Sequence, residues 1–325
     1  MTTTMIAGIA TAEGLTVAEV ARPTPSDEQI LVRVVAAGMN RADLAAAKGM
    51  GVASANSYGK PIGMEWAGEV VEIGSTVTDC VVGDWVACSG TGGYAEYAVA
   101  DQHRIFKLRS GEGAAQAAVL PLALMTAHDA LVVAGLRRGE TVFVHGATSA
   151  VGLATLQIAK ILGAAKVIGG ARSGDKRLRL VTFGADGTID TGAADWSQAL
   201  FEVTDSKGAD VAVDMVSGPC FGELMKGTAI AGRIVNVGRL GGTIGEFDFN
   251  LHALRRISFH GVTFRTRSLE QVRDIVRGVT DELWPSVESG SLSLPIDRRF
   301  DLADAVAAHA YMAGNQHFGK ILLDC

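Results

Sequence analysis

The sequence predicts an α/β protein in which a β-rich part is followed by a parallel sheet with helices on both faces. Short valine-rich segments bounded by Gly, Asp or Ser occupy residues 1 to about 110. From about Leu120, strand and helix patterns alternate, which is typical of a parallel sheet buried on both faces. A glycine turn, HGATSAVG, joins one such strand to an apolar helix pattern. The 325 residues, 48% of them apolar, are enough for two domains.

The expected elements follow from these patterns in chain order. The β-rich part contains strands at QILVRVVAAG, WAGEVVEIG, VGDWVA and YAEYAVA. The alternating part contains a helix at MTAHDALVVAG, the strand TVFVHG, the helix VGLATLQIAKIL, the strand KVIGGA, the helix DKRLRLVTFG, the strand DVAVDMV, the helix FGELMKGTA, and the strands RIVNVG and SFHGVTF. An amphipathic helix, SLEQVRDIVRGVTDEL, and a final helix, LADAVAAHAYMAG, close the chain. We place the boundaries at residues 1–121, 122–265 and 266–325.

The amino-acid composition limits the classes of binding partner and the cellular compartment that we expect for this protein. The formal charge of −6 argues against general binding to nucleic acid or to an anionic membrane. No CxxC pair occurs among the cysteines, and no basic or long apolar leader opens the sequence, so we expect a reducing, cytoplasmic location. The apolar segment 114–136 has the length of a membrane span. Because Pro121 divides it and His128 and Asp129 lie near its middle, buried helices fit better.

The turn HGATSAVG is a candidate phosphate-binding loop. A strand, a tight turn and a helix start bring unpaired N–H groups and the positive end of the helix dipole together. Gly146 supplies the turn and Gly152 the close approach of the helix, while Ser149 and Ala150 are predicted to have ordinary φ values. An ordinary αβ turn is the alternative. The residues expected to contact pyrophosphate, through N–H groups or hydroxyls, are Thr148, Ser149, Ala150, Val151 and Gly152.

The end of the next strand, KVIGGA, predicts the type of cofactor. An acid at this point typically accepts a hydrogen bond from the 2′-hydroxyl of NAD. Here the strand ends in Arg172 and Ser173, with Lys176 one helical turn later and no acid before Asp175. Two cations and a hydroxyl suit a 2′-phosphate, which predicts NADPH. A solvated helix start is the alternative interpretation.

A family resemblance rests on the order and spacing of several motifs. They are AAGMNRADL, GMEWAGEVVEIG, VGDWV, GGYAEY, LPLALMTAHDAL, VFVHGATSAVGLATLQIAK, GRIVNVG and HFGKILL. With them the chain resembles the medium-chain dehydrogenase/reductase superfamily, and within it the zinc-free quinone oxidoreductase branch. The resemblance implies a GroES-like catalytic domain and a Rossmann doubly wound domain, with the last segment returning to the first domain. It also implies a cofactor in the cleft between them and a homodimer.

Zinc-dependent relatives need three protein ligands at positions that the resemblance locates in this chain. Those positions hold Met39–Asn40, Met64 and Met125–Thr126, so we expect no metal. Cys80 and Cys88 are interpreted as buried structural thiols.

The resemblance also assigns site residues. Asn40 and Thr126 match positions beside the nicotinamide and the substrate, where they would orient the substrate and stabilise a developing oxyanion; a turn Asn and a helix-cap Thr are the alternatives. Many relatives carry a tyrosine soon after NRADL; the stretch AAAKGMGVAS lacks one, and Tyr58 is the nearest candidate here. Solvent is the other possible proton donor. Further cofactor positions are Val216, Val237, Gly238, Arg239, Phe264, Asn315 and Lys320.

Other polar and apolar residues remain open to two interpretations. His128 and His145 are interpreted as packed structural residues, not acid catalysts. Met64, Trp66, Met125 and Phe264 form either a substrate wall or ordinary core.

These observations predict an NADPH-dependent reductase of quinones or α,β-unsaturated carbonyl compounds, acting without a metal. One alternative is an enoyl-thioester reductase, in which Arg265 and Arg267 would receive the phosphates of a CoA-like carrier or else be solvated. Another, of a different class, is an NADPH-binding sensor or structural protein with little turnover.

Overall fold

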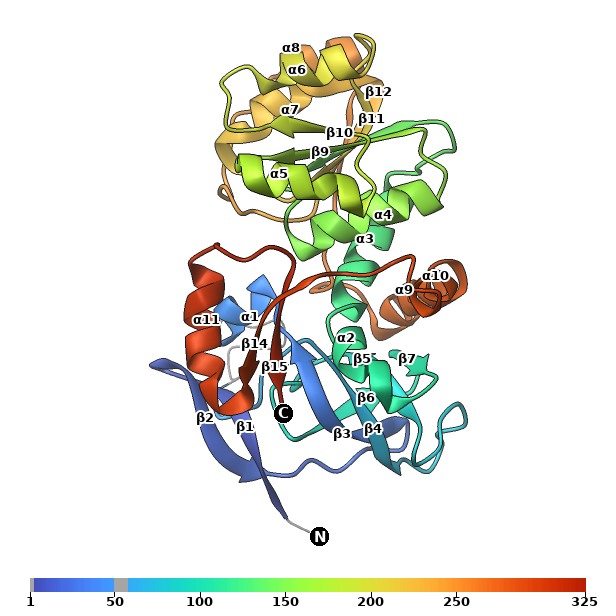
Figure 1. Ribbon diagram of the computed structural model, residues 1–325, viewed down its shortest axis with the longest axis vertical. Coiled ribbons are helices and arrows are strands. Elements are labelled where there is room, and N and C mark those ends of the chain that lie inside the picture. Colours follow the sequence, from blue (N-terminus) through green and yellow to red (C-terminus); the bar gives the residue numbers. More distant parts are fainter. Residues whose placement is uncertain (1–2, 50–57) are drawn as a thin grey trace. The chain divides into compact units, whose positions relative to one another are not determined.

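The computed structural model describes residues 3–49 and 58–325, and the chain forms two compact units (Figure 1). The first unit contains Met1–Leu122, Arg265–Trp284 and Leu294–Cys325, and the second contains Ala123–Phe264 and Pro285–Ser293. The observed units differ from the expected domain boundaries mainly in the short segment Pro285–Ser293, which groups with the second unit. Two hydrogen bonds between Gln157 and Ser293, of 2.9 and 3.2 Å, explain this grouping.

The first unit is built mainly on antiparallel strands, and its one parallel strand pair among the described residues is β14 with β15. Its larger sheet has the order β14-β15-β3-β4-β5-β7, with β6 pairing β3, and β1 pairs β2 in a separate hairpin. The strands are β1 (Thr4–Thr11), β2 (Gly14–Ala21), β3 (Gln29–Gly38), β4 (Glu65–Ile73), β5 (Trp85–Ser89), β6 (Tyr97–Asp101), β7 (Ile105–Leu108), β14 (Ile296–Asp301) and β15 (Lys320–Asp324). The last strand, β15, pairs antiparallel with β3 and so joins the end of the chain to its beginning.

Short helices complete the first unit. They are α1 (Arg41–Ala46), α2 (Ala114–Ala117), α9 (Leu269–Glu282) and α11 (Ala305–Ala313), and α11 lies beside β14 and β15 (Figure 1). The predicted amphipathic helix is α9, which begins at a Ser268 capping box and buries Val272, Ile275, Val276 and Val279. The helix α10 (Trp284–Glu288) starts at the last residue of one first-unit segment and continues into the second unit.

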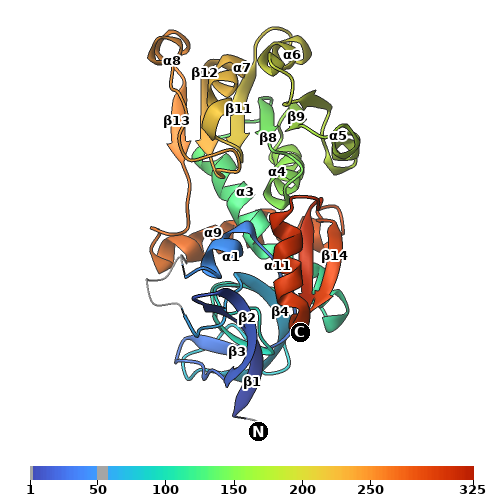
Figure 2. The same ribbon diagram turned by 90° about the vertical axis from the view of Figure 1, so that its left-hand side faces the viewer.

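The second unit is a doubly wound α/β domain with a six-stranded sheet in the order β10-β9-β8-β11-β12-β13, all pairs parallel. The strands are β8 (Thr141–His145), β9 (Lys166–Ala171), β10 (Gly187–Asp190), β11 (Ala209–Asp214), β12 (Thr228–Asn236) and β13 (Ser258–Gly261). Figure 2 shows β13, β12, β11, β8 and β9 side by side, with β13 at one edge of the sheet. The helices are α3 (Pro121–Val133), α4 (Ala150–Ile161), α5 (Gly174–Leu180), α6 (Trp196–Val203), α7 (Phe221–Gly227) and α8 (Phe249–Arg255).

The predicted α/β fold class is therefore confirmed, with two local corrections. Thr126 is not a helix cap, because it lies inside α3, which begins at Pro121. The strand expected over SFHGVTF pairs only across Ser258–Gly261. Across the described part of the chain, no single helix is long and apolar enough to cross a membrane; Gly111–Ala117 and Pro121–Val133 meet the length and composition test only as a pair bent by 57°.

Candidate functional site

The loop between β8 and α4 has the backbone that its sequence predicts. Gly146 has a φ of 83°, and a Cβ on Gly152 would lie 2.7 Å from the Ala147 Cα, so both glycines are required. Ser149 has a φ of −73°, and Ala150 is outside the left-handed region, which confirms the predicted conformation of both residues.

The Ser149 hydroxyl is used inside this loop. It accepts a hydrogen bond from the Gly152 N–H at 3.0 Å and donates one to the Gly146 carbonyl at 3.0 Å, as an N-cap does. Within residues 3–49 and 58–325, the N–H groups of Ala150 and Val151 have no hydrogen-bond partner. These two N–H groups, at the positive end of α4, are the ones available to an anion.

Strand order puts this loop at a reversal point of the sheet. β8 has β9 on one side and β11 on the other, so the connections from these strands run in opposite directions. In open α/β sheets, ligands bind outside the carboxyl ends of the strands at such a point. His145, the last residue of β8, directly precedes the loop and is buried, as expected for a structural histidine.

The end of β9 carries the predicted phosphate-binding side chains. Ser173 is the N-cap of α5 and accepts a hydrogen bond from the Lys176 N–H at 3.4 Å. Arg172 is exposed, and its side chain makes no ion pair with any residue that the structure describes. Its guanidinium is therefore open to an anionic ligand.

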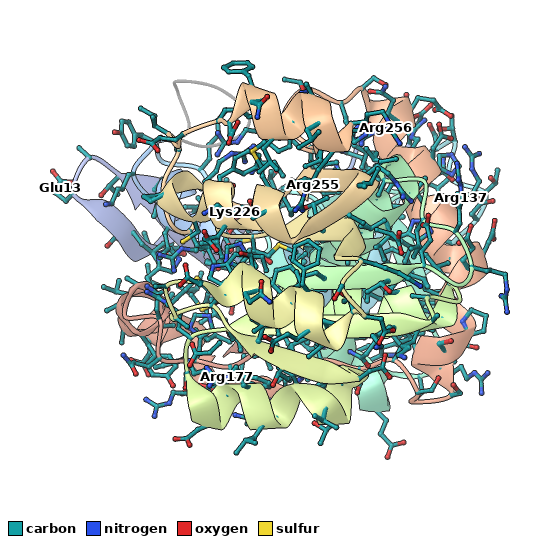
Figure 3. The ribbon with its side chains drawn as sticks, turned by 90° about the horizontal axis from the view of Figure 1, so that it is seen from above. Glu13, Arg137, Arg177, Lys226, Arg255 and Arg256 are labelled. Carbon is teal, nitrogen blue, oxygen red and sulfur yellow. The ribbon has the colours of Figure 1, made fainter. Side chains whose placement is uncertain are left out.

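Sequence reasoning missed an acid close to this position. Asp190, at the end of β10, pairs in register with Ala171 and forms an ion pair of 2.8 Å with Arg177. Arg177, which is labelled in Figure 3, is a residue of α5. Arg177 also donates 3.0 Å hydrogen bonds to the Ala171 and Arg172 carbonyls. The sequence holds no acid between the end of β9 and Asp175, but the structure brings Asp190 from the neighbouring strand to this strand end, where it pairs with Arg177. No spacing rule signals the pair, because Asp190 comes from a separate four-residue strand.

A third group of predicted cofactor residues gathers where β11 and β12 end. The Val216 N–H donates to the Asp214 carboxylate at 2.9 Å, and the Val237 and Gly238 N–H groups donate to the Asp214 carbonyl at 2.9 and 3.1 Å. A Cβ on Gly238 would lie 2.6 Å from the Met215 carbonyl oxygen, so only glycine fits there. Arg239 donates to the Asn236 side chain at 2.8 Å. Phe264 is half-buried and follows β13 by three residues.

In the first unit, a buried ion pair joins strands from opposite ends of the chain. The Lys320 ammonium on β15 is 2% exposed and pairs with the fully buried Glu65 carboxylate on β4. It also donates to the Asn40 Oδ1 at 2.7 Å and to the Met39 carbonyl at 3.2 Å, so all three of its donors are engaged. The other Glu65 oxygen accepts from the Leu122 N–H at 2.8 Å, near the start of α3.

Asn40 is fixed by the same group of residues. Its amide nitrogen donates to Glu65 Oε1 at 3.0 Å and to the Gly38 carbonyl at 3.3 Å, while its oxygen accepts from Lys320. Both amide protons are therefore used, and none is left for the oxyanion contact expected of Asn40. The Lys320 ammonium is likewise engaged in the interior of the first unit, and the cofactor contact that the resemblance implies for it stays a prediction.

Beside this pair lies a second buried acid, Asp43. Its Oδ2 accepts from the Tyr94 hydroxyl and from the Asn40 N–H, both at 2.7 Å, whereas its Oδ1 is buried without a hydrogen-bond partner among the described residues. Burial raises the pKa of the Asp43 carboxyl from 3.8 to about 7, against the lowering effect of these hydrogen bonds. We refer to Asn40, Asp43, Glu65, Tyr94 and Lys320 as the buried polar cluster.

The remaining predicted residues lie apart from this cluster. Tyr58 is 52% exposed; its hydroxyl lies 3.5 Å from the Lys48 carbonyl, and its ring covers Gly49. Part of the stretch where relatives carry a tyrosine, residues 50–57, lies outside the described residues. Asn315 is exposed, has a φ of 56° and accepts a hydrogen bond from Arg41. Thr126 is half-buried within α3.

Models of two known protein families match the chain. The alcohol dehydrogenase GroES-like domain matches residues 26–110, and the zinc-binding dehydrogenase model matches residues 150–278. The chain is also 30% identical over 311 residues to quinone oxidoreductase-like protein 2 of Bos taurus, covering 95% of this chain and 88% of that protein.

The chain belongs to the medium-chain dehydrogenase/reductase superfamily. It is accordingly an NAD(P)-binding oxidoreductase with a GroES-like domain and a Rossmann domain. A second relative is a segment of a phenolphthiocerol/phthiocerol polyketide synthase from Mycobacterium tuberculosis, 30% identical over 313 residues. That match covers 96% of this chain but only 14% of the much longer synthase chain.

Solved structures of the superfamily have the same fold. A quinone oxidoreductase from Pseudomonas syringae pv. tomato DC3000 superposes with a TM-score of 0.86 at 26% identity, covering 99% of this chain and all of that one. The CurK enoyl reductase (TM-score 0.85, 23% identity, 99% and 98% covered) and a mycobacterial protein complexed with NADPH (0.85, 24%, 99% and 100%) share the fold.

The zinc implied by one family model does not fit the residues present here. The expected ligand positions hold Met39, Asn40, Met64, Met125 and Thr126, and both Met39 and Met125 are packed in the interior. The cation that contacts Glu65 and Asn40 is the Lys320 ammonium. Among the residues that the structure describes, no group of three His, Cys, Asp or Glu side chains could hold a metal ion.

Proposed function

We propose that this protein is an NADPH-dependent reductase that transfers hydride to quinones or α,β-unsaturated carbonyl compounds without a metal. The observation that carries the cofactor assignment is the exposed Arg172 guanidinium at the end of β9, next to the Ser173 hydroxyl and Lys176. A guanidinium binds phosphate through paired, charge-assisted hydrogen bonds. Asp190, at the end of the neighbouring strand β10, forms an ion pair with Arg177 and therefore does not repel a 2′-phosphate strongly.

The rest of the second unit supports the same cofactor. The N–H groups of Ala150 and Val151 lie at the helix start where a pyrophosphate binds in this fold. Val216, Val237 and Gly238 come together at the ends of β11 and β12, as the superfamily resemblance expects of residues beside the nicotinamide. When bound, NADPH supplies the hydride; these residues hold and orient its ring.

The acceptor side of the proposal rests on the relatives and on residues of the first unit. Quinone oxidoreductases are among the similar proteins and solved structures. Since the Asn40 amide is engaged with Glu65 and Lys320, we assign it a positioning role and leave Thr126 as the candidate hydroxyl for an oxyanion contact. Tyr58, exposed on the first unit, is retained as a candidate proton donor, and solvent is the alternative.

A second candidate is an enoyl-thioester reductase. It is favoured by the similarity to a polyketide synthase segment and by the fold shared with the CurK enoyl reductase. In this version, Arg265 and Arg267, which follow β13, receive the phosphates of a carrier such as CoA.

We further propose a homodimer formed through the edge strand β13. Large apolar side chains are exposed on α8, which contacts β12, the strand that pairs with β13; they include Phe249 (77% exposed) and Leu254 (71%). Unpaired edge strands with apolar neighbours are sites where chains associate. Light scattering during gel filtration should give twice the mass of one chain, and a monomer at micromolar concentration would contradict this part of the proposal.

Parallel assays test the proposed reaction. NADPH oxidation by the purified protein is followed with an ortho-quinone, a simple enone and a 2-enoyl-CoA. Turnover of the first two supports the proposal, and a strong preference for the enoyl-CoA supports the second candidate. Tight NADPH binding without turnover of any acceptor contradicts both and indicates a sensor or structural role.

A further inference from the structure

The turn that follows β11 contains a residue in a strained backbone conformation. Ser217 has φ 57° and ψ −154°, a region that is populated almost only by glycine. The residue is buried, with 8% of its surface exposed. A strained non-glycine residue persists only where its surroundings hold it, and such residues concentrate at functional sites.

One buried carboxylate holds this turn in place. Asp214, the last residue of β11, is fully buried and accepts hydrogen bonds from the Val216 N–H at 2.9 Å and the Ser217 N–H at 3.1 Å. It also contacts the His145 Nδ1 at 3.0 Å. Asp214 thus connects the end of β8 to the turn after β11, across the point where the strand order reverses.

The Ser217 side chain extends this connection to a third strand. Its hydroxyl lies 3.1 Å from Asp214 Oδ2 and 2.9 Å from the Gly238 carbonyl, and it accepts a hydrogen bond from the Asn236 amide at the end of β12. Glycine at this position would have no strain, but it would lose these three contacts. The hydroxyl therefore links the backbone of Val216 with the backbone of Gly238.

We propose that Ser217 and Asp214 are positioning residues that fix the Val216 turn and the Gly238 backbone for the nicotinamide end of the cofactor. This inference rests on the proposed function, because it assumes that the cofactor's ring lies against these two backbone segments. Neither side chain needs to touch the cofactor. Their effect is to keep the two segments at a fixed spacing, so that the ring is held in one orientation.

Two ligands separate this role from a general structural one. NADP⁺ contains the nicotinamide, whereas 2′,5′-ADP keeps the adenosine and the 2′-phosphate but lacks the nicotinamide. Ser217→Gly should still fold, since relief of the strained φ offsets part of the stability that is lost with the three hydroxyl contacts. It should weaken NADP⁺ binding about fivefold to tenfold, as for the loss of a buried hydrogen bond, and leave 2′,5′-ADP binding unchanged. Calorimetric titration measures both dissociation constants.

Ser217→Ala and Asp214→Asn serve as companion variants, because both retain the strained backbone and lose part of the hydrogen bonding. They should show the same selective loss with lower stability. The matched control is Ser197→Ala on α6, which removes a 2.7 Å hydroxyl contact to Glu223 from a buried serine elsewhere in the unit. It should leave both ligands unaffected.

The outcomes distinguish this inference from the proposed function. If Ser217→Gly leaves the affinity for both ligands unchanged, or weakens the binding of both equally, the positioning role is wrong. Arg172→Ala tests the cofactor assignment separately, since it should weaken 2′,5′-ADP and NADP⁺ alike. An Arg172→Ala protein with unchanged affinity for both would overturn the proposed NADPH site whatever Ser217→Gly does.

Discussion

Two polar regions of this protein, one in each unit, differ in how many of their hydrogen-bond donors remain available to a ligand. In the buried polar cluster of the first unit, the three donors of Lys320 are engaged, as are both amide protons of Asn40. At the strand ends of the second unit, the Arg172 side chain and the N–H groups of Ala150 and Val151 have no partner among the described residues. The donors of the buried polar cluster stabilise the first unit itself, whereas the donors at the strand ends of the second unit can still bind an anionic ligand.

The buried pair offers the strongest test of this contrast. Lys320→Met leaves the Glu65 carboxylate buried without its cation, and breaking such a pair destabilises by about 3–5 kcal/mol. We expect that loss in urea unfolding of the first unit, and we expect partial recovery in the double variant Glu65→Gln/Lys320→Met. Lys107→Met is the control, since the Lys107 side chain is 58% exposed in its pair with Asp84. Equal urea midpoints for Lys320→Met and the natural protein would show that the Glu65–Lys320 pair does not stabilise the first unit.

Asp43 gives this cluster a pH dependence. Its pKa is about 7 in the folded protein against an ordinary 3.8, so between pH 4 and 7 the native state binds more protons than the unfolded state. The stability contributed by this group is full below about pH 4 and is lost as pH rises to about 7, at up to about 1.4 kcal/mol per pH unit.

Asp43→Asn removes this slope. We expect the free energy of unfolding of the variant, relative to the natural protein, to rise between pH 4 and 7 and to level off above that. Burial lowers the pKa of His309 to about 4, which gives an opposite slope, but this contribution is present in both proteins and cancels in the difference. If the free energies of unfolding of the two proteins changed in parallel between pH 4 and 7, the raised pKa of Asp43 would be contradicted.

A smaller effect is expected from Ser149→Ala in the loop before α4. The variant loses the N-cap contact to the Gly152 N–H, which typically destabilises by about 1 kcal/mol. Because the hydroxyl is already used inside the loop, NADPH affinity should change little. Urea unfolding measures the first effect and fluorescence titration the second, with the exposed Ser289→Ala as a control. A large loss of affinity would instead show that the Ser149 hydroxyl binds the cofactor directly.

The smallest effect concerns Asp190 at the end of β10. Its side chain is 45% exposed, so solvent screens its ion pair with Arg177, and Asp190→Asn should change stability by no more than about 0.5 kcal/mol. Removing one negative charge near Arg172 should tighten NADPH binding about twofold. Weaker NADPH binding in titration would indicate that the pair with Arg177 is needed to hold the loop that carries Arg172.

The local parts of this architecture could be predicted from the sequence. The strand β8, the loop and α4 are recognisable because apolar periodicity and two glycines lie next to one another in the chain. Short strands such as β10, with the sequence GTID, carry too little periodicity to be recognised. Asp190 was missed for that reason.

The contacts between distant segments could not be predicted in the same way. Glu65 and Lys320 are 255 residues apart and meet only because β15 pairs with β3 and β3 with β4. The positive φ of Ser217 has no local sequence signal, since serine is rarely found there and tertiary hydrogen bonds hold it. The role expected of Asn40 stays a prediction, and its hydrogen bond with Lys320 depends on this strand pairing, which no local pattern signals.

The affinity of the protein for NADPH against NADH, with and without Arg172, tests the central claim most directly. Fluorescence titration of the natural protein should give tighter binding of NADPH, by about tenfold or more. Arg172→Ala should weaken NADPH about tenfold to a hundredfold and leave NADH unchanged, because a charged hydrogen bond to the 2′-phosphate is lost. Preference for NADH in the natural protein, or unchanged NADPH affinity in the variant, would contradict the assignment of Arg172 as the residue that binds the 2′-phosphate.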